Sequence, residues 1–332
     1  MQLVNQKIVL KHLPIGTPKA SDFSLVSEDM LEPDEGEVLI EIEHLGIDAF
    51  IATTLNHDGW HGRSELNTPV MALGTGRVLK SRAKNLAIGD QVFGGMGAQR
   101  YIIQPGSSCR KLDTTKVPAR SYLGLLGMTT GLTAYAGMLL VADVKEGDTV
   151  AVSAAAGAVG SVACQLAKIR GARVIGIAGG PDKCDFLREI GCDAAIDYKN
   201  SDVNEQLKEL APGGLNVFFD NVGGDILDCA LDNLAMEATV VICGAISQYG
   251  DMASVTGPSN YLRVAERNAS MRGFTVDHYQ SQFPAMEADL TAWAAAGRLQ
   301  LPEHIESGIG SFPDALTMLY NGSHRGKLLV QP

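Results

Sequence analysis

The chain has 332 residues, which is enough for about two domains of ordinary size. Hydrophobic residues make up 45% and charged residues 20% of it, so disorder, collagen and coiled coil are excluded as descriptions of the whole chain. The formal net charge is −11 and no basic block is present, which argues against a nucleic-acid-binding protein, because phosphate contacts supply most of that affinity.

The N-terminal region, residues 1–121, reads as short strands separated by turns. The runs at 38–43, 74–79, 92–94 and 101–104 favour strands, and Gly, Pro and Asp punctuate them. Residues 1–7 contain no apolar signal segment, so we expect no secretion and a cytoplasmic protein. This region is predicted to form a compact β-rich domain.

The next stretch, residues 122–142, is uncharged and long enough to span a bilayer. Its four glycines and three threonines make it only weakly apolar, so we expect no membrane association. The six cysteines of the chain form no C-x-x-C pair, which removes the usual signature of a structural zinc site. Free thiols are expected in a reducing compartment.

From residue 148 onward, apolar strand patterns alternate with helical ones. Strands are predicted at 149–153, 173–178, 194–197, 216–220 and 239–243, with helices between them. This alternation predicts the α/β class, with a doubly wound parallel sheet and right-handed crossovers. A helix at 286–296 and a strand at 327–331 follow. We expect domains at 1–121 and 122–290, the first rejoined by residues from about 291 to 332.

A small-residue turn between the first strand and helix of this alternation is the strongest chemical signal. Small residues there let the backbone approach a pyrophosphate, and a helix N-terminus supplies unpaired N–H groups. Ala155 replaces the first glycine of the G-x-G-x-x-G pattern, so the motif alone is weak. The prediction of a dinucleotide site therefore depends on the position of the turn between a strand and a helix. The predicted pyrophosphate contacts are Gly157, Ala158, Val159 and Gly160.

The residues at the end of the second strand determine the preference for NAD or NADP. NAD requires an acid there, but the chain has Gly179 and Gly180, with Lys183 shortly after. An ammonium would stabilise a 2′-phosphate, which favours NADP(H) as cofactor. Asp182 is an acid near this position and would favour NAD. Its place in the first turn of a helix is also explained by the helix dipole.

Several motifs in order resemble one family. They are the runs 127–135, 154–160, 176–179, 197–199, 219–224 and 243–249. Together they resemble the zinc-independent branch of the medium-chain dehydrogenase/reductase superfamily, and within it the prostaglandin reductase, or leukotriene B4 12-hydroxydehydrogenase, group with its alkenal reductases. The resemblance implies a GroES-like β-rich domain and a Rossmann NADP-binding domain. It also implies a homodimer.

The resemblance assigns roles to matching positions. It implies that Lys183 and Tyr198 hold the 2′-phosphate, and that other residues run along the ribose and nicotinamide. These residues are Asn221, Cys243, Gly244, Ala245, Ile246, Ser247, Tyr249, Phe274, Thr275 and Val276, with Thr133 as a further candidate. The chain departs from the family at Gly180, where a serine is usual, at 129–130, and at His324, where the family has an asparagine that contacts the cofactor. It departs most at 48–52, beside the expected substrate cleft.

The expected chemistry needs no metal. Gly46-Ile47-Asp48 stands where zinc-dependent relatives carry a cysteine ligand, and His57 and His61 sit in loop-like sequence. Reduction of the C=C bond of an enone or enal needs hydride from NADPH, donors for the developing enolate, and a proton. We expect Tyr249 as the nearby phenol, acting as oxyanion donor or proton source. The alternatives are that Tyr249 only packs on the ring and that a ribose hydroxyl of the cofactor does this work. A quinone reductase and a non-catalytic NADPH-binding sensor remain as alternatives.

Overall fold

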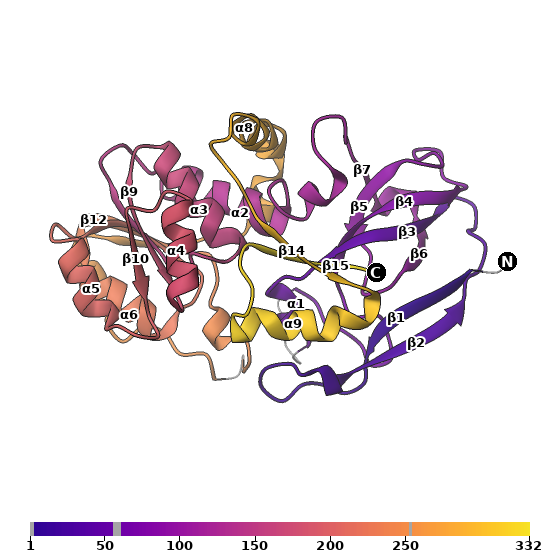
Figure 1. Ribbon diagram of the computed structural model, residues 1–332, viewed down its shortest axis with the longest axis horizontal. Helices are drawn as coiled ribbons and strands as arrows, with labels where there is room; N and C mark the ends of the chain where they lie inside the picture. The colour runs from indigo at the N-terminus through magenta and orange to yellow at the C-terminus, as the bar shows by residue number, and fades with distance from the viewer. Residues whose placement is uncertain (1–2, 56–60, 252–253) are drawn as a thin grey trace. The chain divides into compact units, whose positions relative to one another are not determined.

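The computed structural model describes residues 3–55, 61–251 and 254–332, and the chain divides into two compact units (Figure 1). Unit 1 comprises Met1–Gly124, Tyr249–Met252 and Glu303–Pro332. Unit 2 comprises Leu125–Gln248 and Ala253–Pro302. Unit 1 is therefore assembled from separate stretches of chain, and unit 2 is nearly continuous.

Unit 1 is built mainly from antiparallel strands. One sheet has two strands, β1 (Val4–Leu10) and β2 (Phe23–Asp29). The other sheet has seven strands in the order β14-β15-β3-β4-β5-β7, with β6 also paired to β3. These strands are β3 (Glu37–Gly46), β4 (Leu73–Ser81), β5 (Gln91–Gly95), β6 (Tyr101–Pro105), β7 (Arg110–Lys111), β14 (Glu303–Ser307) and β15 (Lys327–Gln331).

The core of unit 1 forms around β3 and two helices. Val38, Ile40 and Ile42 are buried on one side of β3, as the alternation at 38–43 predicts. They share a cluster with side chains from the helices α1 (Phe50–Leu55) and α9 (Phe312–Asn321). In Figure 1 the yellow α9 belongs to the same unit as the indigo β1 and β2.

An ion pair lies inside unit 1. Lys327, the first residue of β15, is fully buried, and its ammonium donates to Asp48 Oδ1 at 2.5 Å. Asp48 lies two residues before α1 and begins the segment 48–52, in which the sequence departs from the family that it resembles. Asp48 Oδ2 lacks a partner among the described residues. Losing either member would leave an uncompensated buried charge, so each requires the other.

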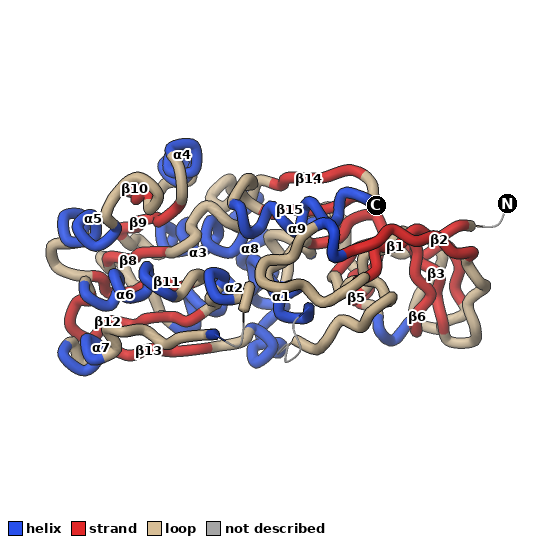
Figure 2. The backbone as a smooth tube through the Cα atoms, turned by 90° about the horizontal axis from the view of Figure 1, so that it is seen from below, coloured by secondary structure: helices blue, strands red, loops and turns tan. Residues whose placement is uncertain are grey.

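Unit 2 contains a six-stranded parallel sheet (Figure 2). Along the sheet the order is β10-β9-β8-β11-β12-β13, so the chain starts in the middle, winds outward to one edge and then returns to wind to the other. This is the doubly wound order, in which the reversal lies between β8 and β11. The strands are β8 (Thr149–Val152), β9 (Arg173–Ala178), β10 (Ala194–Asp197), β11 (Leu215–Asp220), β12 (Leu234–Ile242) and β13 (Ser270–Gly273).

Helices connect these strands. Apolar residues of the sheet and of its helices form one cluster, in which Phe218, Val240 and Leu231 are fully buried. The helices are α2 (Thr133–Tyr135), α3 (Ala158–Ile169), α4 (Pro181–Glu189), α5 (Val203–Leu210), α6 (Gly224–Asp232), α7 (Leu262–Glu266) and α8 (Phe283–Ala295). The parallel sheet of unit 2 and the β-rich unit 1 confirm the predicted fold class.

The uncharged stretch 122–142 forms no long regular helix. Residues 128–141 make wide π-helical turns on either side of the short α2. Within the part of the chain that the structure describes, no helix combines the length and apolarity needed to cross a membrane.

Candidate cofactor site

The turn that follows β8 presents a bare helix N-terminus. Gly157 caps α3 with an extended backbone, φ −77° and ψ 178°, and has no side chain that could occupy the first N–H groups of the helix. Ala154 adopts a left-handed conformation, φ 46°, to make the turn. Such a terminus carries unpaired donors and the positive end of the helix dipole, which suits a pyrophosphate.

Small residues hold this turn close to its neighbours. A Cβ added at Gly160 would collide with the backbone of Ala154 and Ala155. Gly176 of β9 lies opposite Ala155, because a Cβ built there would be 3.1 Å from the Ala155 methyl. The missing side chain at Gly176 therefore makes room for the alanine that replaces the first glycine of the motif.

A buried network ties the ends of β8 and β11 together where the strand order reverses. Ser153 Oγ donates to Asp220 Oδ1 at 2.8 Å and accepts the Asn221 N–H at 2.7 Å. The Asn221 amide donates to the Ser153 carbonyl at 2.7 Å. Burial raises the pKa of Asp220, although hydrogen bonds from Val222, Gly223 and Ser153 oppose the shift. Asn221 is thus fixed at the switch point, where ligands of this sheet topology bind.

Residues 243–247 lie against the same strand end. The N–H groups of Cys243 and Gly244 donate to the Asp220 carbonyl at 2.9 and 3.1 Å. Ile246 N–H donates to the Asn221 carbonyl at 3.1 Å, and Ser247 Oγ to the Val222 carbonyl at 2.6 Å. Burial raises the pKa of the Cys243 thiol to about 12, which disfavours the reactive thiolate form. Ala245 belongs to this stretch as well.

The turn after β9 is shaped by the next strand end. Gly180 has φ 95° and ψ 155°, a conformation that favours glycine, and its N–H donates to Asp197 Oδ1 at 2.8 Å. A Cβ at Gly179 would lie 2.9 Å from the Tyr198 ring, so the ring covers the glycine. Tyr198 remains 45% exposed, which leaves one side of the ring open to a ligand.

Two ammonium groups meet at this turn. Burial, and then the neighbouring Lys199, lower the pKa of Lys183. Among the described residues no carboxylate forms an ion pair with Lys183. The Asp197 carboxylate is engaged by N–H groups of Gly180, Lys199 and Asn200, and these bonds lower its pKa. The positive charge that Lys183 and Lys199 bring to this turn suits the 2′-phosphate of a dinucleotide.

Lys199 was not among the residues predicted for the cofactor. The signal that could have identified it is its place directly after Tyr198, in the loop that follows β10. Parallel strands bring their carboxyl ends to one edge of the sheet, so Lys199 and the turn after β9 are neighbours in space.

The remaining predicted residues divide between the units. Thr133, Phe274, Thr275 and Val276 belong to unit 2, with Thr133 Oγ1 donating to the Met128 carbonyl at 2.6 Å. Tyr249 and His324 belong to unit 1. His324 Nδ1 lies 3.1 Å from the Met318 carbonyl oxygen, which can only accept a hydrogen bond, so Nδ1 carries a proton. The roles expected of these two residues at the cofactor stay predictions.

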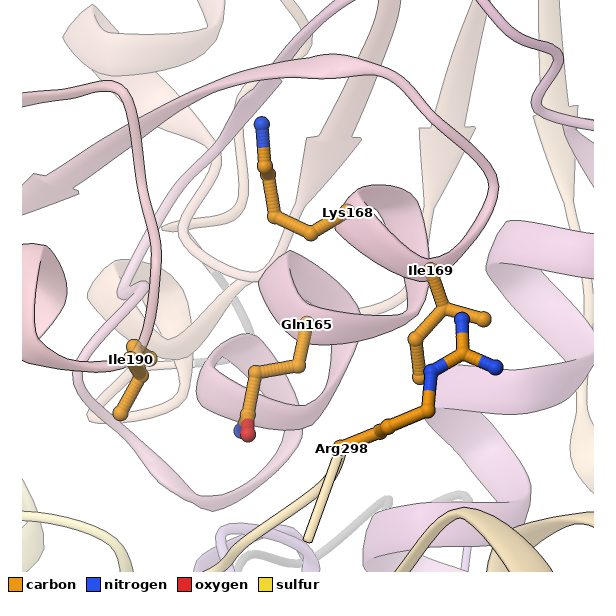
Figure 3. A pocket seen from close by; sticks show the side chains of 5 residues that line it. All are labelled: Gln165, Lys168, Ile169, Ile190 and Arg298. Carbon is orange, nitrogen blue, oxygen red and sulfur yellow. The ribbon is translucent and has the colours of Figure 1, made fainter. Parts of the chain in front are cut away.

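A cavity of about 240 Å³ lies elsewhere in unit 2 (Figure 3). Its lining includes none of the predicted cofactor residues, and its Lys168 is already paired with Asp193 at 2.8 Å. The lining residues are Gln165, Lys168, Ile169, Ile190 and Arg298. This cavity is not the nucleotide site.

The histidine pair singled out in the sequence is only partly visible. His57 lies outside the described residues, whereas His61 Nδ1 is 2.8 Å from Thr53 Oγ1. In the ranges that the structure describes, no group of three or more His, Cys, Asp or Glu side chains is arranged to hold a metal ion.

Comparisons with known proteins agree with this architecture. Residues 6–112 match the model of the N-terminal domain of oxidoreductase, and residues 158–292 match the model of zinc-binding dehydrogenase. The chain is 34% identical to the NADP-dependent 2-alkenal reductase of Nicotiana tabacum, covering 99% of this chain and 98% of that protein. It is also 34% identical to prostaglandin reductase 1 of Bos taurus, covering 97% of each.

Among solved structures, CurA from Vibrio vulnificus in complex with NADPH is similar throughout. It superposes with a TM-score of 0.92 at 34% identity, covering 98% of each chain. The sequence motifs, the doubly wound sheet and these likenesses agree. The chain belongs to the zinc-independent branch of the medium-chain dehydrogenase/reductase superfamily, in the group of the prostaglandin and alkenal reductases.

Proposed function

We propose that this protein, an NADP-dependent oxidoreductase, reduces the C=C bond of α,β-unsaturated ketones and aldehydes. The observation that carries the proposal is the pair of turns after β8 and β9, which offers a bare helix N-terminus and the ammonium groups of Lys183 and Lys199 to one ligand. The similarity to a 2-alkenal reductase and to CurA with NADPH supports the substrate class and the cofactor.

The two turns would hold different parts of the cofactor. The N–H groups from Gly157 to Gly160 bind the pyrophosphate, since no side chain stands in front of them. Lys183 and Lys199 bind the 2′-phosphate, with the Tyr198 ring beside them. Asn221 and residues 243–247 run along the ribose and nicotinamide, because they line the switch point between β8 and β11.

The chemistry divides between cofactor and protein. NADPH, when bound, supplies a hydride for the β-carbon of the enone. The protein holds the carbonyl oxygen with hydrogen-bond donors while negative charge builds on it, and it delivers a proton to the α-carbon. We assign the proton to the phenol of Tyr249, a donor that needs no metal.

The direct test is turnover. Purified protein is mixed with NADPH and 3-nonen-2-one, and the absorbance of the reduced nicotinamide is followed together with the saturated ketone. We expect the loss of NADPH to be matched by the formation of nonan-2-one, and we expect NADH to be consumed much more slowly. Turnover with quinones alone would identify a quinone reductase. A change in NADPH fluorescence without turnover of any acceptor would identify a binding protein.

A further inference from the structure

One carboxylate joins the two loops that carry the ammonium groups of the candidate cofactor site. Asp197 is the last residue of β10, and it pairs with Ala178, the last residue of β9. Asp197 Oδ1 accepts the Gly180 N–H of the turn after β9 at 2.8 Å and the Lys199 N–H of the loop after β10 at 3.0 Å. Asp197 Oδ2 accepts the side-chain amide of Asn200 at 2.7 Å. This single side chain therefore connects the ends of two neighbouring strands of unit 2.

The bond to Gly180 restrains the start of the helix that carries Lys183. Gly180 caps α4, and its carbonyl accepts the Cys184 N–H at 3.2 Å. Lys183 lies in the first turn of α4, shortly after this cap. Glycine has more backbone freedom than any other residue, so a hydrogen bond that restrains Gly180 also restrains the direction in which α4 begins.

The bond to Lys199 orders the second loop. A Cβ built on Gly179 would lie 2.9 Å from Lys199 Cε, so the Lys199 side chain lies across the turn after β9. The main-chain carbonyl of Asp197 accepts the N–H groups of Asn200 and Ser201 at 3.1 and 3.0 Å. Asp197 thus holds its own loop with its backbone, and it holds both loops with its carboxylate.

The following inference rests on the 2′-phosphate site of the proposed function. We propose that Asp197 is a positioning residue for the recognition of NADPH, which holds Lys183 and Lys199 where their two ammonium groups reach one phosphate. Asp197 itself would not touch the phosphate, because like charges repel. The two ammonium groups outweigh its single negative charge, so the turn still attracts a phosphate.

The carboxylate of Asp197 differs from the acid that binds NAD in related folds. That acid accepts hydrogen bonds from the ribose hydroxyls of the cofactor. In this chain both carboxylate oxygens of Asp197 already accept N–H groups of the protein. Hydrogen bonds from Gly180 and Asn200 lower the pKa of Asp197, so it is ionised at neutral pH and acts only as an acceptor. Asp197 therefore organises the site and leaves the cofactor to the lysines.

The test is Asp197→Ala, studied by calorimetric titration with NADPH and with NADH. Without the carboxylate, Gly180 and Lys199 lose their common acceptor, and the two lysines are less often in the geometry that binds a phosphate. If that geometry is populated about one-tenth of the time, the affinity for NADPH falls roughly tenfold. The affinity for NADH, which lacks the 2′-phosphate, should stay the same. Adenosine 2′,5′-bisphosphate should lose as much affinity as NADPH, because it carries the same phosphate.

The conservative variant Asp197→Asn separates positioning from charge. Its amide oxygen can accept the N–H groups of Gly180 and Lys199, so we expect an NADPH affinity close to that of the wild type. If Asp197 acted through repulsion of the phosphate, both variants would bind NADPH more tightly than the wild type. If its charge were itself required, Asp197→Asn would be as weak as Asp197→Ala. Either result overturns the positioning role.

A matched control is Asp202→Ala. Asp202 caps α5 in the same region of unit 2, where its Oδ1 accepts the Glu205 N–H at 3.0 Å. Loss of this cap should lower the melting temperature without changing the preference for NADPH. If Asp197→Ala behaves like this control, with NADPH and NADH affected alike or not at all, Asp197 is merely structural and the proposal is overturned.

The wild type separates this inference from the proposed function. Wild-type protein that binds NADPH no better than NADH would overturn the assignment of the two lysines, and the role of Asp197 with it. Wild-type protein that prefers NADPH but reduces no enone would overturn the proposed reaction, and the variants would still decide the role of Asp197. A preference for NADPH that survives unchanged in Asp197→Ala would overturn that role alone.

Discussion

The turns after β8 and β9 lie at neighbouring strand ends and use opposite means of recognition. The turn at 153–157 offers backbone N–H groups and excludes side chains, as the collision at Gly160 shows. The turn at 179–181 is open, and charged side chains, Lys183 and Lys199, approach it. Under the proposed function, the backbone groups would recognise the pyrophosphate that all dinucleotides share, and the ammonium groups would recognise the phosphate that distinguishes NADPH from NADH.

The largest effect is expected from filling the first turn. Gly160→Val would push a side chain into the backbone of Ala154 and Ala155, so the turn and the start of α3 must separate. We expect the affinity for NADPH and NADH to fall alike by at least about 100-fold, or ~3 kcal/mol. Calorimetric titration with each cofactor measures both values.

The control for this variant is Gly213→Ala, also in unit 2. A Cβ at Gly213 would meet nothing within 4 Å, and its φ is not in the left-handed region, so cofactor binding should be unchanged. A Gly160→Val protein that still binds both cofactors normally would show that close packing at this turn does not matter for recognition.

An intermediate effect is expected at the second turn. Lys183→Ala removes a charged hydrogen bond to the 2′-phosphate, worth about 1.5–3 kcal/mol. The affinity for NADPH should therefore fall about 10- to 100-fold while the affinity for NADH stays the same. Lys208→Ala is a suitable control, because Lys208 is exposed and paired with Glu205. An unchanged cofactor preference in Lys183→Ala would refute the assignment of the two turns.

The smallest effect is a dependence on pH. The pKa of Lys183 is below its usual range because of burial and Lys199, so its ammonium is complete below that pKa and is lost as pH rises through it. The preference for NADPH over NADH should decline by a few-fold with rising pH, and earlier than an ordinary lysine with a pKa of about 10.4 would cause. Paired dissociation constants across pH measure this decline, which should vanish in Lys183→Ala.

Sequence patterns predicted most of unit 2 because its buried strands are short apolar runs bounded by turn residues. The strand expected at 173–178 is β9, and the strand expected at 194–197 is β10. By contrast, β13 and β14 were not predicted, since Ser270–Gly273 is mostly exposed and Glu303–Ser307 is mostly polar. Nor was the early start of β12 at Leu234, where the sequence reads as helix and Glu237 bends the strand at φ 59°.

In the candidate site, too, the sequence predicts some features and misses others. Glycines and the position of Lys183 identify the two turns from sequence alone, because their spacing from the strands is fixed. The left-handed Ala154 and the second ammonium of Lys199 depend on contacts between distant segments. No local pattern carries that information.

The buried pair of Lys327 and Asp48 sets a constraint on biosynthesis. The two residues are 279 positions apart, and β15 lies between β14 and β3 in the finished sheet. While the chain emerges from the ribosome, the end of β3 at Leu45 and Gly46 stays without its β15 partner, and the Asp48 carboxylate stays without its counterion, until residues 327–331 arrive. Unit 2 can meanwhile fold almost entirely on its own, so nascent chains that stall before β15 would be targets for chaperones through unit 1.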